Sequence, residues 1–244
     1  MNEEKKKPSI EEVFVGIASK IKRKGIDKLM AYLKTCTDFF NAPASTRFHG
    51  NYEGGLIFHS INVYQRLVYE VKTANCIEEY IHNHDESLRI VALFHDLCKA
   101  NTYKVVKKNQ KCYDEEKVRN AQRWQIKEDA GGKYIWDQVN VYEKDEDFPF
   151  GHGEKSVYIL QKFIDLTDEE AMAIRWHMGG FDCSVKGGER LDVVYEKYPL
   201  AFLLHIADLK ATYIDEQEFK NAAPLIPYDF EEEYEKIVRE GLDE

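Results

Sequence analysis

The sequence predicts a mainly α-helical fold, a helical bundle with one small β-rich insertion. Apolar residues recur every three or four positions through most of the chain, as in the stretch 88–99, and this spacing is typical of helices with one buried face. Between about 101 and 150 the pattern changes to short alternating segments around glycines, which is typical of strands. Hydrophobic residues make up 43% of the 244-residue chain, enough for one large domain or two small ones.

This pattern divides the chain into three expected segments. Residues 1–44 form an N-terminal helical segment, in which Gly25 separates two amphipathic runs between about 9 and 40. Residues 45–215 form the main domain, which contains the β-rich insertion at about 101–150. Residues 216–244 form an acidic C-terminal tail, expected from about 229 onward to be a short solvated helix or disordered.

Composition narrows the functional classes. The net charge of −10 argues against tight binding of long nucleic acid, which needs clustered lysine and arginine, but allows a small anionic substrate at a local positive site. No stretch approaches the roughly 20 apolar residues of a membrane span, and the charged N-terminus lacks the apolar core of a signal peptide. The chain has five scattered cysteines and no CxxC pair, which indicates reduced thiols. We therefore expect a cytoplasmic protein without membrane contact, whose oligomeric state stays open.

One predicted helix ends in an unusual polar group. This helix is expected over about 86–99 with Asp85 as its N-cap, and His95 lies in line with its apolar stripe. Asp96 is adjacent, and Lys99 follows one helical turn later. An imidazole, a carboxylate and an ammonium at the inner end of a buried helix need a common partner, because burying an uncompensated charge is costly. The polar connection before this helix contains two histidines that are expected to be solvent-exposed, His82 and His84.

The other helices of the main domain also carry polar side chains on their apolar faces. A helix that starts after the glycines at 54–55 carries His59 inward, and a helix that starts at 151–153 carries His152. A capping box at 167–170 starts a helix that ends at the glycines 179–180, with His177 pointing inward at its C-terminus. After an expected loop at 181–197, the last core helix, about 198–214, carries Asp208 on its buried face.

The insertion is expected to contain two or three strands, at about 102–107, 123–127 and 134–142, with a turn at 131–132. It leaves the main domain just after Lys99 and returns at His152, so both of its ends lie near the polar group. Its many aromatic residues could stack a base as a lid that selects a small nucleotide. Alternatively, they form one face of a hairpin packed on helices, or an oligomer contact. These aromatic residues are Tyr103, Tyr113, Trp124, Tyr134, Trp136, Tyr142, Phe148 and Phe150.

The inward polar residues together indicate a metal site. Each of them alone is more often a core residue with satisfied hydrogen bonds. As a set, they exceed what packing requires, and mixed histidine and carboxylate ligands suit Fe, Mn, Zn or Co. The lack of cysteine among them argues against a Cys-type structural zinc site, and six ligands fit two metal ions bridged by a carboxylate. The set consists of His59, His95, Asp96, His152, His177 and Asp208.

In order and spacing, these residues resemble the HD-domain superfamily of metal-dependent phosphohydrolases, in its six-ligand, two-metal branch. The segments Asn51-Tyr-Glu-Gly-Gly-Leu-x-x-His59 and Gly151-His-Gly-Glu154 are similar to those in the HD domain of YhaM-type 3′–5′ exoribonucleases and its phage relatives. The resemblance covers about residues 45–215. The chain differs from the family pattern in having Cys98, where the family usually has glycine.

The resemblance implies a role for each residue. Asp96 would bridge the two metal ions, with His59, His95 and Asp208 completing one site and His152 and His177 the other. Lys99 would meet a substrate phosphate as a point charge, while a metal-activated hydroxide attacks phosphorus in line. Three further candidates for phosphate contacts rank second: Arg47, His49 and Arg175. For Arg175, an exposed helix position without such a role is the favoured interpretation.

The resemblance implies a hydrolase acting on a phosphodiester or phosphomonoester of a nucleotide or short oligonucleotide. Two alternatives use the same fold. An HD-type di-iron oxygenase has the same ligand set, and would be recognised by bound iron and substrate-dependent O₂ consumption. A non-catalytic regulatory HD module would be recognised by the lack of bound metal.

Overall fold

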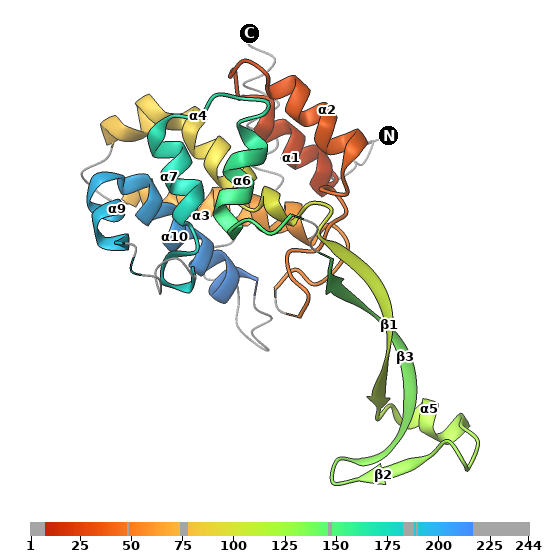
Figure 1. Ribbon diagram of the computed structural model, residues 1–244. Coiled ribbons are helices and arrows are strands. Elements are labelled where there is room, and N and C mark those ends of the chain that lie inside the picture. The colour runs from red at the N-terminus through yellow and green to blue at the C-terminus, as the bar shows by residue number, and fades with distance from the viewer. Residues whose placement is uncertain are drawn as a thin grey trace, which may run out of the picture.

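The computed structural model describes residues 8–47, 49–73, 78–145, 148–182, 188 and 190–216, without the side chains of residues 78–84. The described chain is mainly helical and contains one small three-stranded sheet, which confirms the mainly α-helical class predicted from the sequence. Figure 1 shows a body of packed helices and a β-hairpin arm that projects from it. None of the described helices is long and apolar enough to cross a membrane.

The N-terminal segment forms two helices, α1 (Ile10–Ala18) and α2 (Ile26–Cys36). Ser9 and Glu12 form a capping box at the start of α1, because each side chain accepts a hydrogen bond from the other residue's backbone N–H. Gly25 separates the helices, as predicted, with a left-handed backbone (φ 98°). A Cβ atom there would lie 1.9 Å from the Phe163 carbonyl oxygen, so both the backbone conformation and the packing require glycine.

The core of the body lies among α3 (Gly55–Thr73), α4 (Glu78–Phe94), α6 (His152–Leu160), α7 (Asp168–Trp176) and α10 (Pro199–Lys210). Helix α3 packs against α4 and α10, while α7 packs against α6 and α10. Helix α3 is enclosed by its neighbours and buries residues on most of its faces. The predicted capping box of α7 is present, with the Thr167 side chain accepting from the Glu170 N–H.

The helix before the His-Asp pair differs from its prediction. It was expected over 86–99 with Asp85 as N-cap, but α4 begins at Glu78 and ends at Phe94. Asp85 lies inside this helix and forms an ion pair with Arg89 one turn later, so it is not a cap. At Asp96 the backbone leaves the helical region (φ −100°, ψ 19°), and a 3-10 turn, η1 (Leu97–Lys99), follows. The side chains of His82 and His84 lie outside the described part of the structure.

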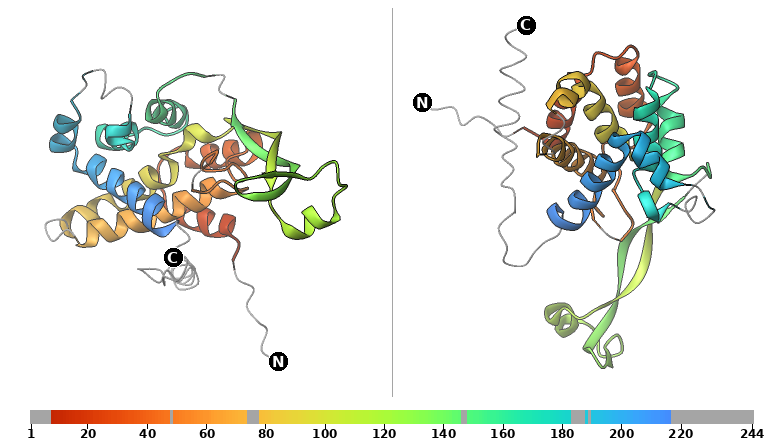
Figure 2. Two further views of the ribbon diagram at one scale, coloured as in Figure 1. Left: turned by 90° about the horizontal axis from the view of Figure 1, so that it is seen from below. Right: turned by 90° about the vertical axis from the view of Figure 1, so that its left-hand side faces the viewer.

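The insertion forms the arm. Strand β1 (Tyr103–Cys112) pairs antiparallel with β3 (Gly132–Lys144), and the short β2 (Lys127–Asp129) pairs with the other edge of β3. The first and third predicted strands are therefore present, but the prediction of a strand at 123–127 is wrong for most of its length, because residues 123–125 form a turn and β2 starts at Lys127. A short helix that was not predicted, α5 (Glu115–Asn120), precedes it, because Asp114 caps the Lys117 N–H. Figure 2 shows that the arm extends away from the helices.

The region before α10 also differs from its prediction. The stretch 181–197 was expected to be a loop, but a 3-10 turn, η2 (Gly179–Phe181), and a helix, α9 (Leu191–Lys197), are present. Helix α9 has no side-chain cap and no fully buried residue, so its sequence carries neither of the usual helix signals. After α10 the chain continues as a π-helical turn, η3 (Ala211–Asp215), to Glu216. The rest of the predicted tail, 217–244, lies outside the described residues.

Candidate metal centre

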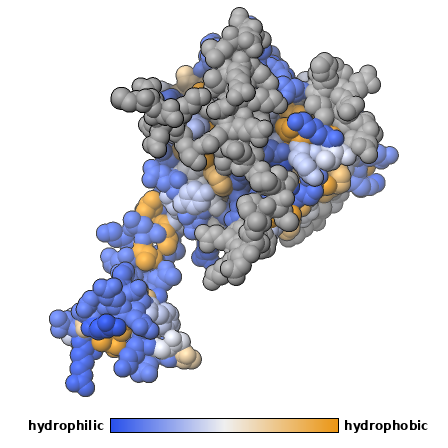
Figure 3. Space-filling model, turned by 180° about the vertical axis from the view of Figure 1, so that it is seen from behind, coloured by the Kyte–Doolittle hydropathy of each residue, from blue (hydrophilic) through white to orange (hydrophobic). Residues whose placement is uncertain are grey.

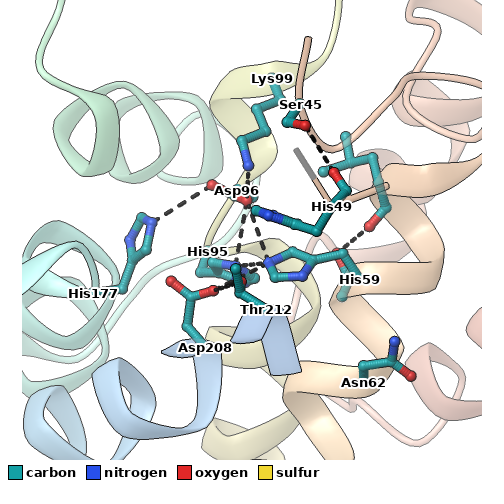
Figure 4. A network of polar contacts seen from close by, with 12 residues as sticks. Ser45, His49, His59, Asn62, His95, Asp96, Lys99, His177, Asp208 and Thr212 are labelled. Atoms are coloured by element: carbon teal, nitrogen blue, oxygen red, sulfur yellow. Dashed lines mark hydrogen bonds and ion pairs between the residues drawn. The ribbon is translucent and has the colours of Figure 1, made fainter. Parts of the chain in front are cut away.

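Asp96 lies at the centre of a buried polar cluster of side chains on or next to α3, α4, α6, α7, α10 and η1. Figure 4 shows the part of this cluster around His59, His95, His177 and Asp208. The Oδ2 atom of Asp96 is 2.5 Å from the Lys99 ammonium, and its Oδ1 atom is 2.6 Å from His152 Nε2. His177 Nε2 lies 3.5 Å from the same Oδ1 atom. The side chain of Asp96 is only 3% exposed, so these contacts replace water.

On the other side of Asp96, His59 and His95 face Asp208. His59 Nε2 lies 3.2 Å from Asp208 Oδ1 and 3.6 Å from Asp96 Oδ2. His95 Nε2 lies 3.5 Å from Asp96 Oδ2 and 3.3 Å from His59 Nε2. The structure thus brings all six predicted ligands and Lys99 into one cluster.

Close helix contacts allow this convergence. A Cβ atom on Gly153 would lie 2.3 Å from the Arg175 carbonyl oxygen, so glycine lets the start of α6 approach the end of α7 and brings His152 near His177. A Cβ atom on Gly55 would lie 2.0 Å from the Gly50 carbonyl oxygen. That contact holds the first turn of α3, which carries His59, against the preceding loop. The glycines in both sequence segments therefore serve to position metal-ligand candidates.

Hydrogen bonds fix the tautomers of the buried imidazoles. His95 Nδ1 lies 2.8 Å from the Ala92 carbonyl and His177 Nδ1 lies 2.7 Å from the Ile174 carbonyl. Because a carbonyl only accepts, each Nδ1 must carry the hydrogen, so Nε2 is the atom of each ring that faces the cluster and is free to bind a metal ion. His177 Nε2 is buried and has no hydrogen-bond partner among the described residues. The Nε2 atoms of His95 and His177 therefore face carboxylate oxygens, an arrangement that a bound cation would stabilise.

The spacing of these atoms fits a transition metal ion. Ligand atoms bonded at 2.0–2.2 Å with angles near 90–109° lie roughly 3.0–3.5 Å apart. The distances among His59 Nε2, His95 Nε2, Asp208 Oδ1 and Asp96 Oδ2 that are given above run from 3.2 to 3.6 Å. The cluster could therefore hold a metal ion without large rearrangement of these side chains.

Charges within the cluster shift several pKa values. Burial lowers the pKa of His95 to about 3. Burial opposes protonation of His59 as well, but Glu216 and Asp208 outweigh it and raise the pKa to about 10. At His152, burial is outweighed by Cys98 and Asp96, which raise the pKa to about 10. Without a metal ion, protons on His59 and His152 thus compensate the carboxylates, so a metal ion would displace protons when it binds.

The arrangement differs from the expected one at His152 and His177. Cys98 Sγ lies 3.5 Å from His152, and Asp96, Cys98 and His152 are close enough to share one ion. None of the six predicted ligands is a cysteine, but the Cys98 thiol lies beside two of them. His177 groups with His95 and Asp208, rather than with His152 alone.

Sequence reasoning missed Glu216, which begins the segment predicted to be a tail. Its Oε1 atom accepts hydrogen bonds from His59 Nδ1 at 2.9 Å and from Asn62 Nδ2 at 3.0 Å. Glu216 thereby fixes the ring orientation that turns His59 Nε2 toward Asp96, as carboxylates that hydrogen-bond to a metal-binding histidine do. The sequence contains only a weak signal for this role, because the π-helical turn η3 between Asp208 and Glu216 is needed to bring Glu216 to the cluster.

The second-rank candidates have different surroundings. The His49 ring lies against His59, with ring centroids 4.8 Å apart, and burial together with the neighbouring His59 lowers its pKa to about 4. Arg47 is exposed. The expected exposure of Arg175 is wrong, because this side chain is buried and forms ion pairs with Asp182 at 2.7 Å and Glu154 at 3.0 Å. Packing of α6 on α7 encloses it, which the pattern of α7 alone did not indicate.

The arm is not a lid over the cluster. The paired strands β1 and β3 project away from the helices rather than across them (Figures 1 and 2). Most of the predicted aromatic residues are exposed or partly exposed, except Tyr134. Solvent reaches the cluster instead beside His152, which is 33% exposed, and Asp208, which is 15% exposed.

Comparison of the chain with family models, with curated proteins and with solved structures found no significant match. The geometry of the cluster, a buried group of histidine and aspartate side chains that could hold a metal ion, is therefore the basis for any functional assignment.

Proposed function

We propose that the protein is a metal-dependent phosphohydrolase of the HD type, which cleaves a phosphodiester or phosphomonoester of a nucleotide or short oligonucleotide. The observation that carries this proposal is the set of imidazole lone pairs around Asp96, above all the buried, unpartnered His177 Nε2 beside a carboxylate and an ammonium. Such a site attracts a cation and, next to it, an anion.

The residues that would hold metal ions are those of the cluster. His59, His95, Asp96 and Asp208 would form one site, and His152 and His177, with Asp96 shared, a second. Divalent Fe, Mn, Zn or Co suits these ligands. When bound, such ions would activate water for attack on phosphorus and stabilise the charge of the phosphoryl oxygens.

The remaining residues support phosphate chemistry. The Lys99 ammonium is held 2.5 Å from Asp96, so it lies within reach of a phosphate at the cluster. Burial, opposed by the stronger effect of Asp96, leaves the pKa of Lys99 raised, so the side chain stays positive at neutral pH. Glu216 accepts a hydrogen bond from His59 Nδ1, and the Ala92 and Ile174 carbonyls accept hydrogen bonds from Nδ1 of His95 and of His177, respectively. Preorganised ligands of this kind reduce the cost of ordering the site.

Metal analysis of the purified protein combined with a hydrolysis panel tests the proposal. The panel contains bis(p-nitrophenyl) phosphate, nucleoside monophosphates, cyclic nucleotides and short oligonucleotides, each with added Mn²⁺ and with chelator. We expect hydrolysis of at least one nucleotide substrate, abolished by chelator. Bound iron with substrate-dependent O₂ consumption and no hydrolysis would instead indicate an oxygenase, and a protein without metal or turnover a regulatory module.

A further inference from the structure

The two faces of the arm differ in chemistry. In an antiparallel ladder, directly opposed residues point to the same side, and alternate residues along each strand share that side. The pairing of Tyr103 with Lys144, of Lys111 with Trp136 and of Lys127 with Tyr134 therefore defines one face. We call it the lysine–aromatic face. It consists of Tyr103, Val105, Lys107, Asn109, Lys111, Lys127, Asp129, Tyr134, Trp136, Gln138, Asn140, Tyr142 and Lys144.

Charge is segregated onto this face. It carries four lysines and a single carboxylate, Asp129, which is already paired with Lys111, although the whole chain has a net charge of −10. Lys107 and Lys127 have no ion-pair partner among the described residues. The opposite face has equal numbers of both signs: Lys104, Lys108, Lys133, Glu128, Asp137 and Glu143. The lysine–aromatic face is thus complementary to a polyanion.

The same face exposes flat and polar groups between its lysines. Trp136 is 54% exposed, Tyr142 is partly exposed, and the side chains of Asn109, Gln138 and Asn140 are exposed. The arm surface is mostly hydrophilic, with small apolar patches along it (Figure 3). Aromatic rings stack bases, amides hydrogen-bond to their edges, and lysines neutralise phosphates. Trp136 packs edge-on against Tyr134, and exposed rings flanked by lysines and amides fit this use better than burial against an apolar protein surface.

We propose that the lysine–aromatic face binds single-stranded nucleic acid. This inference rests on the proposed function, because it identifies the ligand as the strand whose end enters the metal centre. The arm is joined to that centre at its base: β1 begins four residues after Lys99, and the Asp145 N–H donates to the Thr102 carbonyl at 2.8 Å. A strand of β1's ten residues spans about 33 Å, enough for several nucleotides.

A second copy of the chain is a poorer occupant. Two arms could pair through the part of β3 beyond Tyr134, which β2 does not cover, or through β1, whose outer edge is free of further strands among the described residues. That strand carries Lys104, Lys107, Lys108 and Lys111, and lysines on an edge strand oppose pairing with an identical strand by repulsion.

The test measures fluorescence anisotropy of labelled 12-nucleotide single-stranded RNA and DNA with the full-length protein in chelator, so that binding does not depend on bound metal. The variants are Lys107→Glu and Trp136→Ala on the lysine–aromatic face, and Lys133→Glu on the opposite face. We expect Lys107→Glu and Trp136→Ala each to weaken binding about fivefold to tenfold at low salt. Lys133→Glu should stay within about twofold of wild type, and Lys107→Glu should lower the salt dependence.

Lys107→Glu retains the backbone pairing of the arm, so it keeps the inference testable even if Trp136→Ala perturbs the arm. Equal effects of Lys107→Glu and Lys133→Glu would overturn the assignment to this face, as would a wild-type protein that binds neither oligonucleotide. A Lys107→Glu variant with unchanged oligonucleotide binding but an altered sedimentation coefficient would also overturn it, in favour of self-association. Failure of the proposed function would appear separately, as absence of metal-dependent hydrolysis by wild-type protein that still binds the oligonucleotides.

Discussion

Two buried carboxylates in this molecule have very different surroundings. Glu170 Oε1 accepts hydrogen bonds from Arg23 at 2.9 Å and Ser87 at 2.6 Å, and its Oε2 accepts from Arg23 at 3.0 Å and the Thr167 N–H at 2.8 Å. Each of these partners is a donor. Around Asp96, by contrast, Lys99 and His152 are close, but His95 and His177 turn nitrogen lone pairs toward it.

Glu170 is surrounded by donors alone, whereas Asp96 also faces groups that can accept. At Glu170, protein donors complete the network, so the network can stabilise the packing of α7 on the N-terminal segment and α4 without any other group. Around Asp96, carboxylate oxygens and the Nε2 atoms of His95 and His177 face one another, an arrangement that a bound metal ion would stabilise. The following predictions, in order of decreasing effect, test whether the two sites differ in this way.

Asp96→Asn should have the largest effect on function. The amide keeps the size of the side chain but removes the charge that two metal ions would share. We expect metal content to fall to background by elemental analysis, and hydrolysis to fall at least about a hundredfold. Glu170→Gln is the matched control, because it neutralises another buried carboxylate and should retain the metal. Full metal content in Asp96→Asn would contradict the assignment of Asp96.

Glu170→Gln should instead have the larger effect on stability. We expect the free energy of unfolding to fall by about 2–3 kcal/mol in urea titrations, less than for a fully buried pair because Arg23 keeps Glu86 as a partner. Burial opposes ionisation of Glu170, but Arg23 and Ser87 outweigh it and lower its pKa below 4.5.

The sign of that shift gives a pH dependence. A carboxylate with a lowered pKa in the folded state adds stability above its unfolded pKa, and this contribution is lost as the pH falls through the folded pKa. The difference in unfolding free energy between wild type and Glu170→Gln should therefore be constant above about pH 5.5 and shrink below about pH 4.5. A difference that grows in acid would show that Glu170 is not held ionised by Arg23.

Lys99→Met should separate substrate binding from metal binding. The apolar side chain keeps the length of the buried stem but removes the ammonium, so kcat/KM for a phosphate ester should fall about tenfold to a hundredfold. Metal content should stay at the wild-type level. Loss of metal in Lys99→Met would mean that the ion pair with Asp96 serves the metal site rather than the substrate.

Glu216→Gln should have the smallest effect. The amide can still pair with Asn62, but it is a weaker acceptor for the His59 Nδ1–H, so metal affinity should fall about tenfold in competition with a chelating dye. Glu70→Gln is a suitable control, because Glu70 pairs with Lys210 away from the cluster. Equal affinities in the two variants would show that Glu216 does not position His59.

Residues with strong local signals were predictable from the sequence. The capping box at Thr167, the break at Gly25 and the alternation of β1 and β3 each depend on a few neighbouring residues, and each is present in the structure. Helix bounds without such a signal were not predictable. The polar first half of α4 looks like a connection, and α9 has neither a cap nor a buried stripe.

The residues of the candidate site also differ in how far the sequence could predict them. Inward register along single helices was enough to bring together His59, His95, Asp96 and Asp208. Sequence alone did not indicate Glu216, since its contact with His59 depends on the π-helical turn that follows α10. The direction of the arm also depends on contacts that are not local, so the alternating pattern predicted β1 and β3 but could not decide whether the arm covers the cluster.

The most direct test of the account is an anomalous difference map from crystals grown with Mn²⁺. We expect a peak bonded at about 2.0–2.3 Å to His59, His95, Asp96 and Asp208, and a second peak bonded to Asp96, His152 and His177. A peak at the first position alone would contradict the two-metal arrangement and favour a one-metal nucleotidase. If no peak appears within about 5 Å of Asp96 while Mn²⁺ is bound elsewhere, the cluster is not a metal centre.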